Sequence, residues 1–200
     1  MALGSIAVFC GSRFGDDPSY ADLARATGRT LAEQGTTVVY GGGHVGLMGA
    51  VADAALEVGG RVIGVIPQAL ADREVEHRGL TELHVVGDKH ERKALMAQLS
   101  DAFIALPGGV GTLEEITEQW TWQQLAIHAK PSVFLDAGDF WAPMRLMVDR
   151  MVGEGFVTAE GPSIPYFTGD LTDALAELER RSAPVQLPGT EQPFDPEDLV

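Results

Sequence analysis

Short apolar runs alternate with longer amphipathic segments along the whole chain. The apolar runs are rich in β-branched and aromatic residues, which is typical of strands. We predict strands at Ser5–Cys10, Thr37–Tyr40, Arg61–Ile66, Leu83–Val86, Ala102–Leu106 and Ser132–Leu135. The segments between and after them have the length and apolar spacing of helices. We predict helices at Ser19–Gln34, Val45–Val58, Lys89–Leu99, Leu113–His128, Phe140–Glu154 and Leu171–Arg181.

The predicted strands are apolar throughout rather than alternating, which is typical of a parallel sheet covered on both faces. Strand–helix alternation then predicts an α/β fold, a doubly wound Rossmann-like parallel sheet with helices on both faces. No internal repeat or linker interrupts residues 1–182, which we predict to form a single nucleotide-binding domain. Residues 183–200 combine four prolines with acidic side chains and few apolar ones. This composition predicts a disordered acidic tail.

Composition excludes several kinds of partner. The chain has 29 acidic and 14 basic side chains among 200 residues, a net charge of −15 that would repel nucleic acid and anionic membranes. No apolar run approaches the roughly 20 residues of a membrane span, and the N-terminus lacks a signal-peptide pattern. The single cysteine, Cys10, allows no intrachain disulfide and suits a reducing compartment. We therefore expect a cytoplasmic protein that binds neither nucleic acid nor membrane.

Three predicted strands end in turns of glycine or small residues, where parallel sheets bind ligands. The sequence PGGVGT at Pro107–Thr112 follows a buried strand and opens a helix, so its backbone amides suit a phosphate. It is neither a Walker A loop nor GxGxxG, so neither a nucleoside triphosphate nor a dinucleotide is indicated. A simple strand-to-helix turn is the competing interpretation. One small anion would also suit the densest basic cluster, which spans residues 89–93.

The other two turns are weaker candidates for the same pocket. Cys10-Gly11-Ser12 follows the first strand, and Gly41-Gly42-Gly43 follows the second. Glycines in such turns often serve backbone packing alone. Gly11, Ser12, Gly42 and Gly43 are therefore secondary pocket candidates.

Two adjacent carboxylates, Glu114 and Glu115, begin the helix that PGGVGT opens. A carboxylate there lies close to whatever the loop binds and can act as a general base or stabilise a cation. The alternative is structural, because Thr112 and Glu115 have the spacing of a capping box, in which the glutamate bonds the amide of the N-cap residue. The sequence alone leaves both interpretations open.

The segment Asp88–Lys93, DKHERK, has the same double character. Asp88 and Glu91 have the spacing of a capping pair, and the basic residues can simply be solvated. However, Arg92 and Lys93 begin a helix near the carboxyl edge of the predicted sheet. An arginine there can bind a phosphate or ribose through two donors, whereas a lysine acts as a point charge.

Other chemistries have little support in the sequence. The five histidines show no metal-ligand spacing, Cys10 is better explained as a small core residue, and no GxSxG elbow is present. None of the three lysines has evident surroundings for a pyridoxal phosphate Schiff base. We therefore expect no metal and no organic cofactor.

Four motifs together closely resemble the LONELY GUY (LOG) family of cytokinin riboside 5′-monophosphate phosphoribohydrolases, often mislabelled lysine decarboxylases. The motifs are VFCGSRFG at 8–15, VYGGGHVGLMG at 39–49, HERKALM at 90–96 and LPGGVGTLEEITEQWTWQQL at 106–125. The resemblance implies hydrolysis of the N-glycosidic bond of N6-substituted adenosine 5′-monophosphates, and of AMP, to free base and ribose 5-phosphate.

The resemblance also implies site residues. It makes Arg92 and Glu115 the catalytic pair. The substrate contacts that it implies are Glu74, Lys93, Gly109, Val110, Gly111, Thr112, Leu113, Glu114 and Thr121. One departure is visible, because Lys89 stands where the family usually has methionine, which bears on base preference more than on reaction type.

Two other functions remain open at this stage. The first is a general purine nucleoside 5′-monophosphate nucleosidase. The second is a non-catalytic nucleotide or molybdenum-cofactor carrier, against which the presence of both Arg92 and Glu115 argues. Trp120 and Trp122, on the predicted helix at 113–128, indicate either core packing or a partner surface, and the resemblance implies a homodimer.

Overall fold

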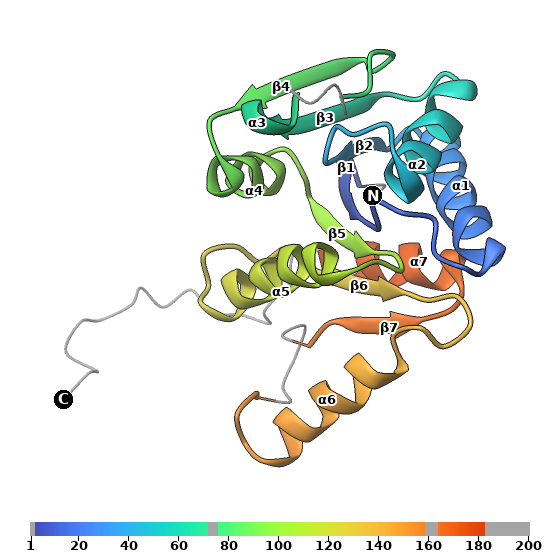
Figure 1. The fold of residues 1–200 in the computed structure, drawn as a ribbon. Helices are drawn as coiled ribbons and strands as arrows, with labels where there is room; N and C mark the ends of the chain where they lie inside the picture. The colour runs from blue at the N-terminus through green and yellow to red at the C-terminus, as the bar shows by residue number, and fades with distance from the viewer. Residues whose placement is uncertain (1–2, 72–75, 159–163, 183–200) are drawn as a thin grey trace, which may run out of the picture.

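The computed structural model describes residues 3–71, 76–158 and 164–182 of the chain. They contain a seven-stranded sheet in the order β4-β3-β2-β1-β5-β6-β7, and every neighbouring pair of strands is parallel. Figure 1 shows helices on both sides of this sheet. The predicted doubly wound α/β architecture is therefore confirmed.

The element boundaries follow the predicted ones closely, except for α5, which begins and ends before the predicted helix at Leu113–His128. The strands are β1 Ser5–Phe9, β2 Thr37–Tyr40, β3 Val62–Pro67, β4 Glu82–Val86, β5 Ala102–Ala105, β6 Ser132–Leu135 and β7 Tyr166–Thr168. The helices are α1 Pro18–Glu33, α2 Gly46–Glu57, α3 Gln68–Ala71, α4 Lys89–Gln98, α5 Val110–Gln124, α6 Ala142–Gly153 and α7 Leu171–Ser182. The short elements α3 and β7 were not predicted, because four and three residues are too few to show a period.

The two faces of the sheet carry separate apolar cores. Alternate residues of β1, such as Ile6 and Val8, face α1, α2 and α7, whereas Ala7 and Phe9 face α4, α5 and the start of α6. This alternation follows from the two-residue period of a strand, and both faces are apolar because both are covered. Strand β4 differs, with polar Glu82 and a partly exposed surface, because it lies at the edge of the sheet.

The strand order reverses direction at β1, which pairs with β2 on one side and with β5 on the other. In open parallel sheets, the loops after two such strands lead to opposite faces and leave a crevice between them. The loops after β1, β2 and β5 are the three turns of glycine or small residues that the sequence singled out as candidate ligand sites. The fold therefore brings them to one edge of the sheet.

Candidate active site

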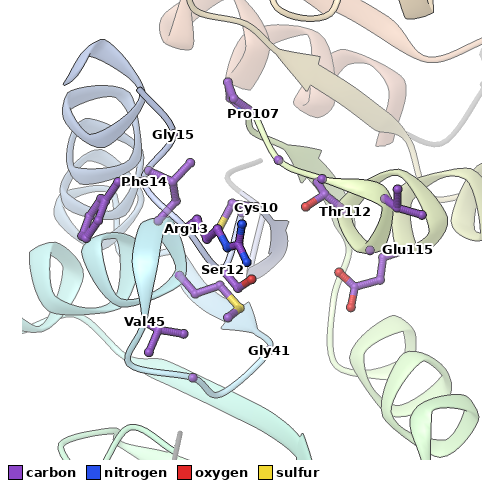
Figure 2. Close-up of a pocket in the computed structure, with 18 of the residues that line it drawn as sticks. Cys10, Ser12, Arg13, Phe14, Gly15, Gly41, Val45, Pro107, Thr112 and Glu115 are labelled. Carbon is purple, nitrogen blue, oxygen red and sulfur yellow. The ribbon is translucent and has the colours of Figure 1, made fainter. Parts of the chain in front are cut away.

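A cavity of about 920 Å³ lies at this reversal point (Figure 2). Its walls come from the segment after β1 (10–15), the turn after β2 with the start of α2, the loop at 107–112, and α4. The volume lies in the range of small-molecule sites. Of the predicted residues, those that line the cavity are Gly11, Ser12, Gly43, Arg92, Gly109, Val110, Gly111, Thr112 and Glu115.

Close backbone approach fixes the position of these loops. The Gly11 amide donates to the Pro107 carbonyl over 3.1 Å, and the Leu47 amide donates to the Gly11 carbonyl over 3.0 Å. A Cβ on Gly108 would lie 2.2 Å from Thr112 Oγ1, so glycine is required there by space. Gly11 therefore joins the loop after β5 to the start of α2.

Helix α5 begins earlier than predicted, at Val110 instead of Leu113. Gly109 is its N-cap residue and supplies no side-chain cap, so Val110, Gly111 and Thr112 form the first turn. The amides of a first turn have no partner within the helix and favour an anion. Because all three residues line the cavity, the N-terminus of α5 opens onto it.

This geometry overturns the capping-box interpretation of Glu115. Thr112 is the third residue of α5 rather than its N-cap, and Glu115 bonds a different group. One oxygen of Glu115 lies 3.0 Å from a terminal nitrogen of Arg92, which comes from α4. Both side chains are 13% exposed, so the pair is largely removed from water yet borders the cavity.

Gly41 makes room for this pair. A Cβ on Gly41 would lie 2.2 Å from a terminal nitrogen of Arg92 and 3.3 Å from Met48 Sδ. The Arg92 guanidinium therefore packs directly against the backbone of the glycine turn after β2. The Nε of Arg92 is buried and has no hydrogen-bond partner among the described residues.

The surroundings of Glu115 act on its protonation in two directions. Burial raises the pKa of this carboxyl above its ordinary value, while the charge of Arg92 opposes the rise. Burial also raises the pKa of the Cys10 thiol far above its usual range, and the charge of Glu115 adds to the effect. Cys10 is thus a buried, protonated core residue rather than a nucleophile, as expected from the sequence, and it also lines the cavity.

The start of α4 is capped as the sequence predicts. Asp88 accepts hydrogen bonds from the amides of His90 and Glu91, over 2.7 and 2.9 Å. The cap orients the first turns of α4 so that Lys89 and Arg92, three residues apart, both line the cavity.

Other residues implied by the resemblance do not line the cavity. Lys93 is buried and forms ion pairs with Glu114 and with Glu118, the latter over 3.0 Å. These three charges therefore pair within the protein and do not line the cavity. Leu113 packs against the core cluster of α4 and α5. Thr121 is exposed and donates to the Thr117 carbonyl. Glu74 lies outside the described residues.

Gly42 has a backbone role instead of a place in the cavity wall. Its φ of +75° favours glycine, and an added Cβ would lie 3.2 Å from Ile66 and 3.3 Å from Leu83. The structure thus separates Gly42, which packs on β3, from Gly43, which lines the cavity.

Sequence reasoning missed several wall residues. Arg13 adds charge, and apolar side chains such as Met48, Ile66 and Phe140 cover other parts of the cavity. Lys89, which the sequence singled out as a departure from the family, also lines it. Arg13 and Met48 lie within the quoted motifs, but no pattern distinguished them from solvated or core side chains.

Neither a metal cluster nor a membrane-spanning helix occurs in the described ranges. No three His, Cys, Asp or Glu side chains there are grouped so as to hold a metal ion. Likewise, no described helix has the length and apolar character needed to cross a bilayer.

Comparison with known proteins identifies the family. A protein-family model described as "possible lysine decarboxylase" matches residues 48–178. A cytokinin riboside 5′-monophosphate phosphoribohydrolase from Rhodococcoides fascians is 48% identical over 175 residues, which cover 87% of this chain and 88% of that protein. The enzyme of the same name, LOG, from Oryza sativa subsp. japonica is 48% identical over 174 residues, covering 87% and 72%.

Solved structures share the fold at much lower identity. The molybdenum cofactor binding protein from Rippkaea orientalis aligns with a TM-score of 0.67 and 20% identity, over 90% of this chain and 97% of that one. This likeness concerns the fold alone. The family model and the relatives at 48% identity together establish that the chain belongs to the LONELY GUY (LOG) family.

Proposed function

We propose that this protein hydrolyses the N-glycosidic bond of cytokinin riboside 5′-monophosphates, releasing the N6-substituted adenine and ribose 5-phosphate. The observation that carries the proposal is the Arg92–Glu115 pair, which borders the cavity beside the first turn of α5. The names of the relatives at 48% identity support the same reaction and substrate class.

In this proposal, Glu115 acts on the ribose. Cleavage of the bond to N9 leaves positive charge on the sugar ring, and a neighbouring carboxylate can stabilise that charge or activate the attacking water. Water supplies the hydroxyl group that C1′ gains and the proton that the base requires. Glu115 is suited to this role because it is held by Arg92 and largely shielded from solvent.

Arg92 has two roles in the proposal. Its charge favours the ionised form of Glu115, against the effect of burial. Its guanidinium also donates hydrogen bonds in a fixed plane, which suits orientation of the ribose or of the departing base.

The first turn of α5 is the proposed phosphate site. The amides of Val110, Gly111 and Thr112 border the cavity, and a helix N-terminus stabilises an anion through these donors and the helix dipole. Glu115 lies one turn further along the same helix. A nucleotide held there by its phosphate would place its ribose within reach of Glu115.

The test is to incubate the purified protein with AMP and, separately, with isopentenyladenosine monophosphate. Free base and ribose 5-phosphate are then measured chromatographically, with and without added metal. We expect release that does not require metal, faster from the isopentenyl substrate. Equal or faster release from AMP would indicate a general nucleotide hydrolase. Binding of both nucleotides without any release would refute hydrolysis and favour a carrier.

Two substitutions test the proposed pair. Arg92→Ala and Glu115→Gln should each lower kcat/KM by at least about 100-fold, because each removes a group proposed to act in the transition state. Arg29→Ala and Glu57→Gln are matched controls, since Arg29 and Glu57 form an exposed ion pair on α1 and α2 with a distance of 2.8 Å. Near-normal turnover in a folded Arg92 or Glu115 variant would exclude that residue from catalysis.

A further inference from the structure

The cavity carries more positive charge than the proposed catalytic pair requires. Its described wall contains three basic side chains, Arg13, Lys89 and Arg92, and one carboxylate, Glu115. This excess of cations occurs in a chain whose net charge is −15. A basic cavity in an acidic protein favours a ligand with more than one negative charge, such as a phosphate monoester.

Arg13 belongs to the turn that follows β1, and the backbone there is tightly held. A Cβ on Gly46 would lie 2.4 Å from the Arg13 nitrogen, and one on Gly11 would lie 2.9 Å from the Arg13 oxygen. Gly11 is in turn bonded to Pro107, in the loop that leads into α5. The backbone of Arg13 is therefore fixed next to the N-terminal loop of α5.

The side chain of Arg13 has no polar partner in the described part of the protein. No ion pair or side-chain hydrogen bond joins it to residues 3–71, 76–158 or 164–182. Figure 2 shows it in the cavity beside Cys10 and Ser12, across from Thr112 and Glu115. By contrast, Arg92 is paired with Glu115 over 3.0 Å.

We propose that Arg13 is a specificity-determining residue that binds the substrate phosphate together with the first turn of α5. This inference rests on the proposed function. A guanidinium offers two parallel donors to phosphate oxygens, and the helix amides offer donors from the opposite wall. Arg13 thereby selects the 5′-monophosphate over the riboside that lacks the phosphate.

Lys89 is placed differently and serves another part of the cavity. It lies on α4, three residues before Arg92, and its charge is among those that act on Glu115. The loop of Arg13 instead contacts Pro107 and Gly108, which directly precede α5. Phosphate binding is therefore assigned to Arg13 rather than to Lys89.

The test compares Arg13→Gln with the wild-type protein in steady-state kinetics and in calorimetric titration with ribose 5-phosphate. We expect KM for the nucleotide and Kd for ribose 5-phosphate to rise about 10- to 100-fold, the range of one charge-assisted contact. We expect kcat to change by less than about 3-fold, because the phosphate contact is the same in ground and transition states. Binding of the riboside should not change.

Two further variants separate a specific contact from general effects. Arg13→Lys should restore part of the affinity, because it returns the charge but not the paired donors. Arg25→Gln removes one positive charge from an exposed site on α1, where the arginine is 55% exposed, and should leave KM unchanged. If Arg25→Gln raised KM as much as Arg13→Gln did, net charge would explain the effect and the proposal would be wrong.

The outcomes distinguish this inference from the proposed function. If the wild type releases base and Arg13→Gln keeps its KM and its ribose 5-phosphate affinity, the role of Arg13 is refuted and hydrolysis stands. An equal loss for nucleotide and riboside would also refute it. If the wild type binds ribose 5-phosphate through Arg13 but releases no base, hydrolysis fails and the phosphate contact stands.

Discussion

At the scale of single residues, the surroundings of Glu115 determine the pKa of its carboxyl. Burial raises the pKa of its carboxyl, and Arg92, placed 3.0 Å away, opposes that rise. Arg92 and Glu115 belong to different helices, α4 and α5, and meet only at the cavity. The ionisation of Glu115 therefore depends first on burial and on Arg92 of α4, and its neighbour Glu114 on α5 adds a smaller effect that raises the pKa.

The pH dependence of activity should reflect this shift. Because the folded-state pKa is raised, ionised Glu115 is lost at a higher pH than an exposed glutamate, whose pKa is about 4.3. If catalysis requires the carboxylate, kcat/KM should fall on acidification with a midpoint above that value. The sign for stability is opposite, because the raised pKa favours the folded state at low pH and this contribution disappears as pH rises through the folded pKa.

A profile of kcat/KM from pH 4 to 8, with stability followed by circular dichroism, measures this effect. Arg92→Ala should raise the pKa of Glu115 further, which carbon-13 NMR of the carboxyl can follow without turnover. An unchanged or lower pKa in that variant would show that Arg92 does not favour the ionised carboxylate.

Gly41 is the second decisive single residue. In Gly41→Ala the new Cβ would lie 2.2 Å from the Arg92 guanidinium, the flexible end of a side chain, so the guanidinium must move away from its position at Glu115. We expect kcat to fall about 10- to 100-fold, as for misplacement of a catalytic group by about 1 Å. The melting temperature should change little.

Gly153→Ala is the control for Gly41→Ala, because an added Cβ there, at the end of α6, meets no atom within 4 Å. Steady-state kinetics and thermal unfolding of both variants provide the comparison. Equal kcat in wild type and Gly41→Ala would mean that Arg92 does not need its observed position.

At the scale of elements, the close contact of α1 with α2 supports the cavity wall. A Cβ on Gly28 of α1 would lie 2.1 Å from the Val51 carbonyl oxygen of α2. Both atoms belong to helices that cover the same face of the sheet, and α2 begins at the glycine that holds the Arg13 backbone. The spacing of these helices therefore helps to set the position of the loop after β1.

Gly28→Ala should destabilise the protein by about 2 to 3 kcal/mol, because two backbones would have to separate in a packed core. Chemical denaturation measures the change, again with Gly153→Ala as the control. A loss below about 0.5 kcal/mol would show that the two helices can separate at almost no cost.

At the scale of the whole molecule, charge is distributed unevenly. The chain has a net charge of −15, whereas the described cavity wall has two more cations than carboxylates. A basic cavity of this kind can attract a small anion in spite of the negative net charge of the whole chain. That the protein binds no nucleic acid stays a prediction. The cytoplasmic location and the homodimer stay predictions, as do the domain boundary at residue 182 and the acidic tail beyond it.

The sequence left open whether Trp120 and Trp122 of α5 pack in the core or form a partner surface. Trp120 is buried within the chain itself. Trp122 is partly buried against the core cluster on the α4 and α5 face of the sheet and contacts His128 edge-on. Core packing thus explains them in the described part of the chain. Exposed apolar side chains instead belong to other positions, including Leu125 at the C-cap of α5 and Leu146 and Met147 on α6.

The sequence by itself determined the sheet, the order of its longer elements and the glycine loops, because apolar periodicity and turn chemistry are local properties of the chain. It also identified the family through motifs that contain Arg92 and Glu115. Only the tertiary structure decided what individual charges do. It paired Glu115 with Arg92 instead of the α5 cap, and Lys93 with Glu114 and Glu118. It also placed Arg13 at the cavity. The partner of a charged side chain depends on which helices the sheet brings together, and no local pattern records that.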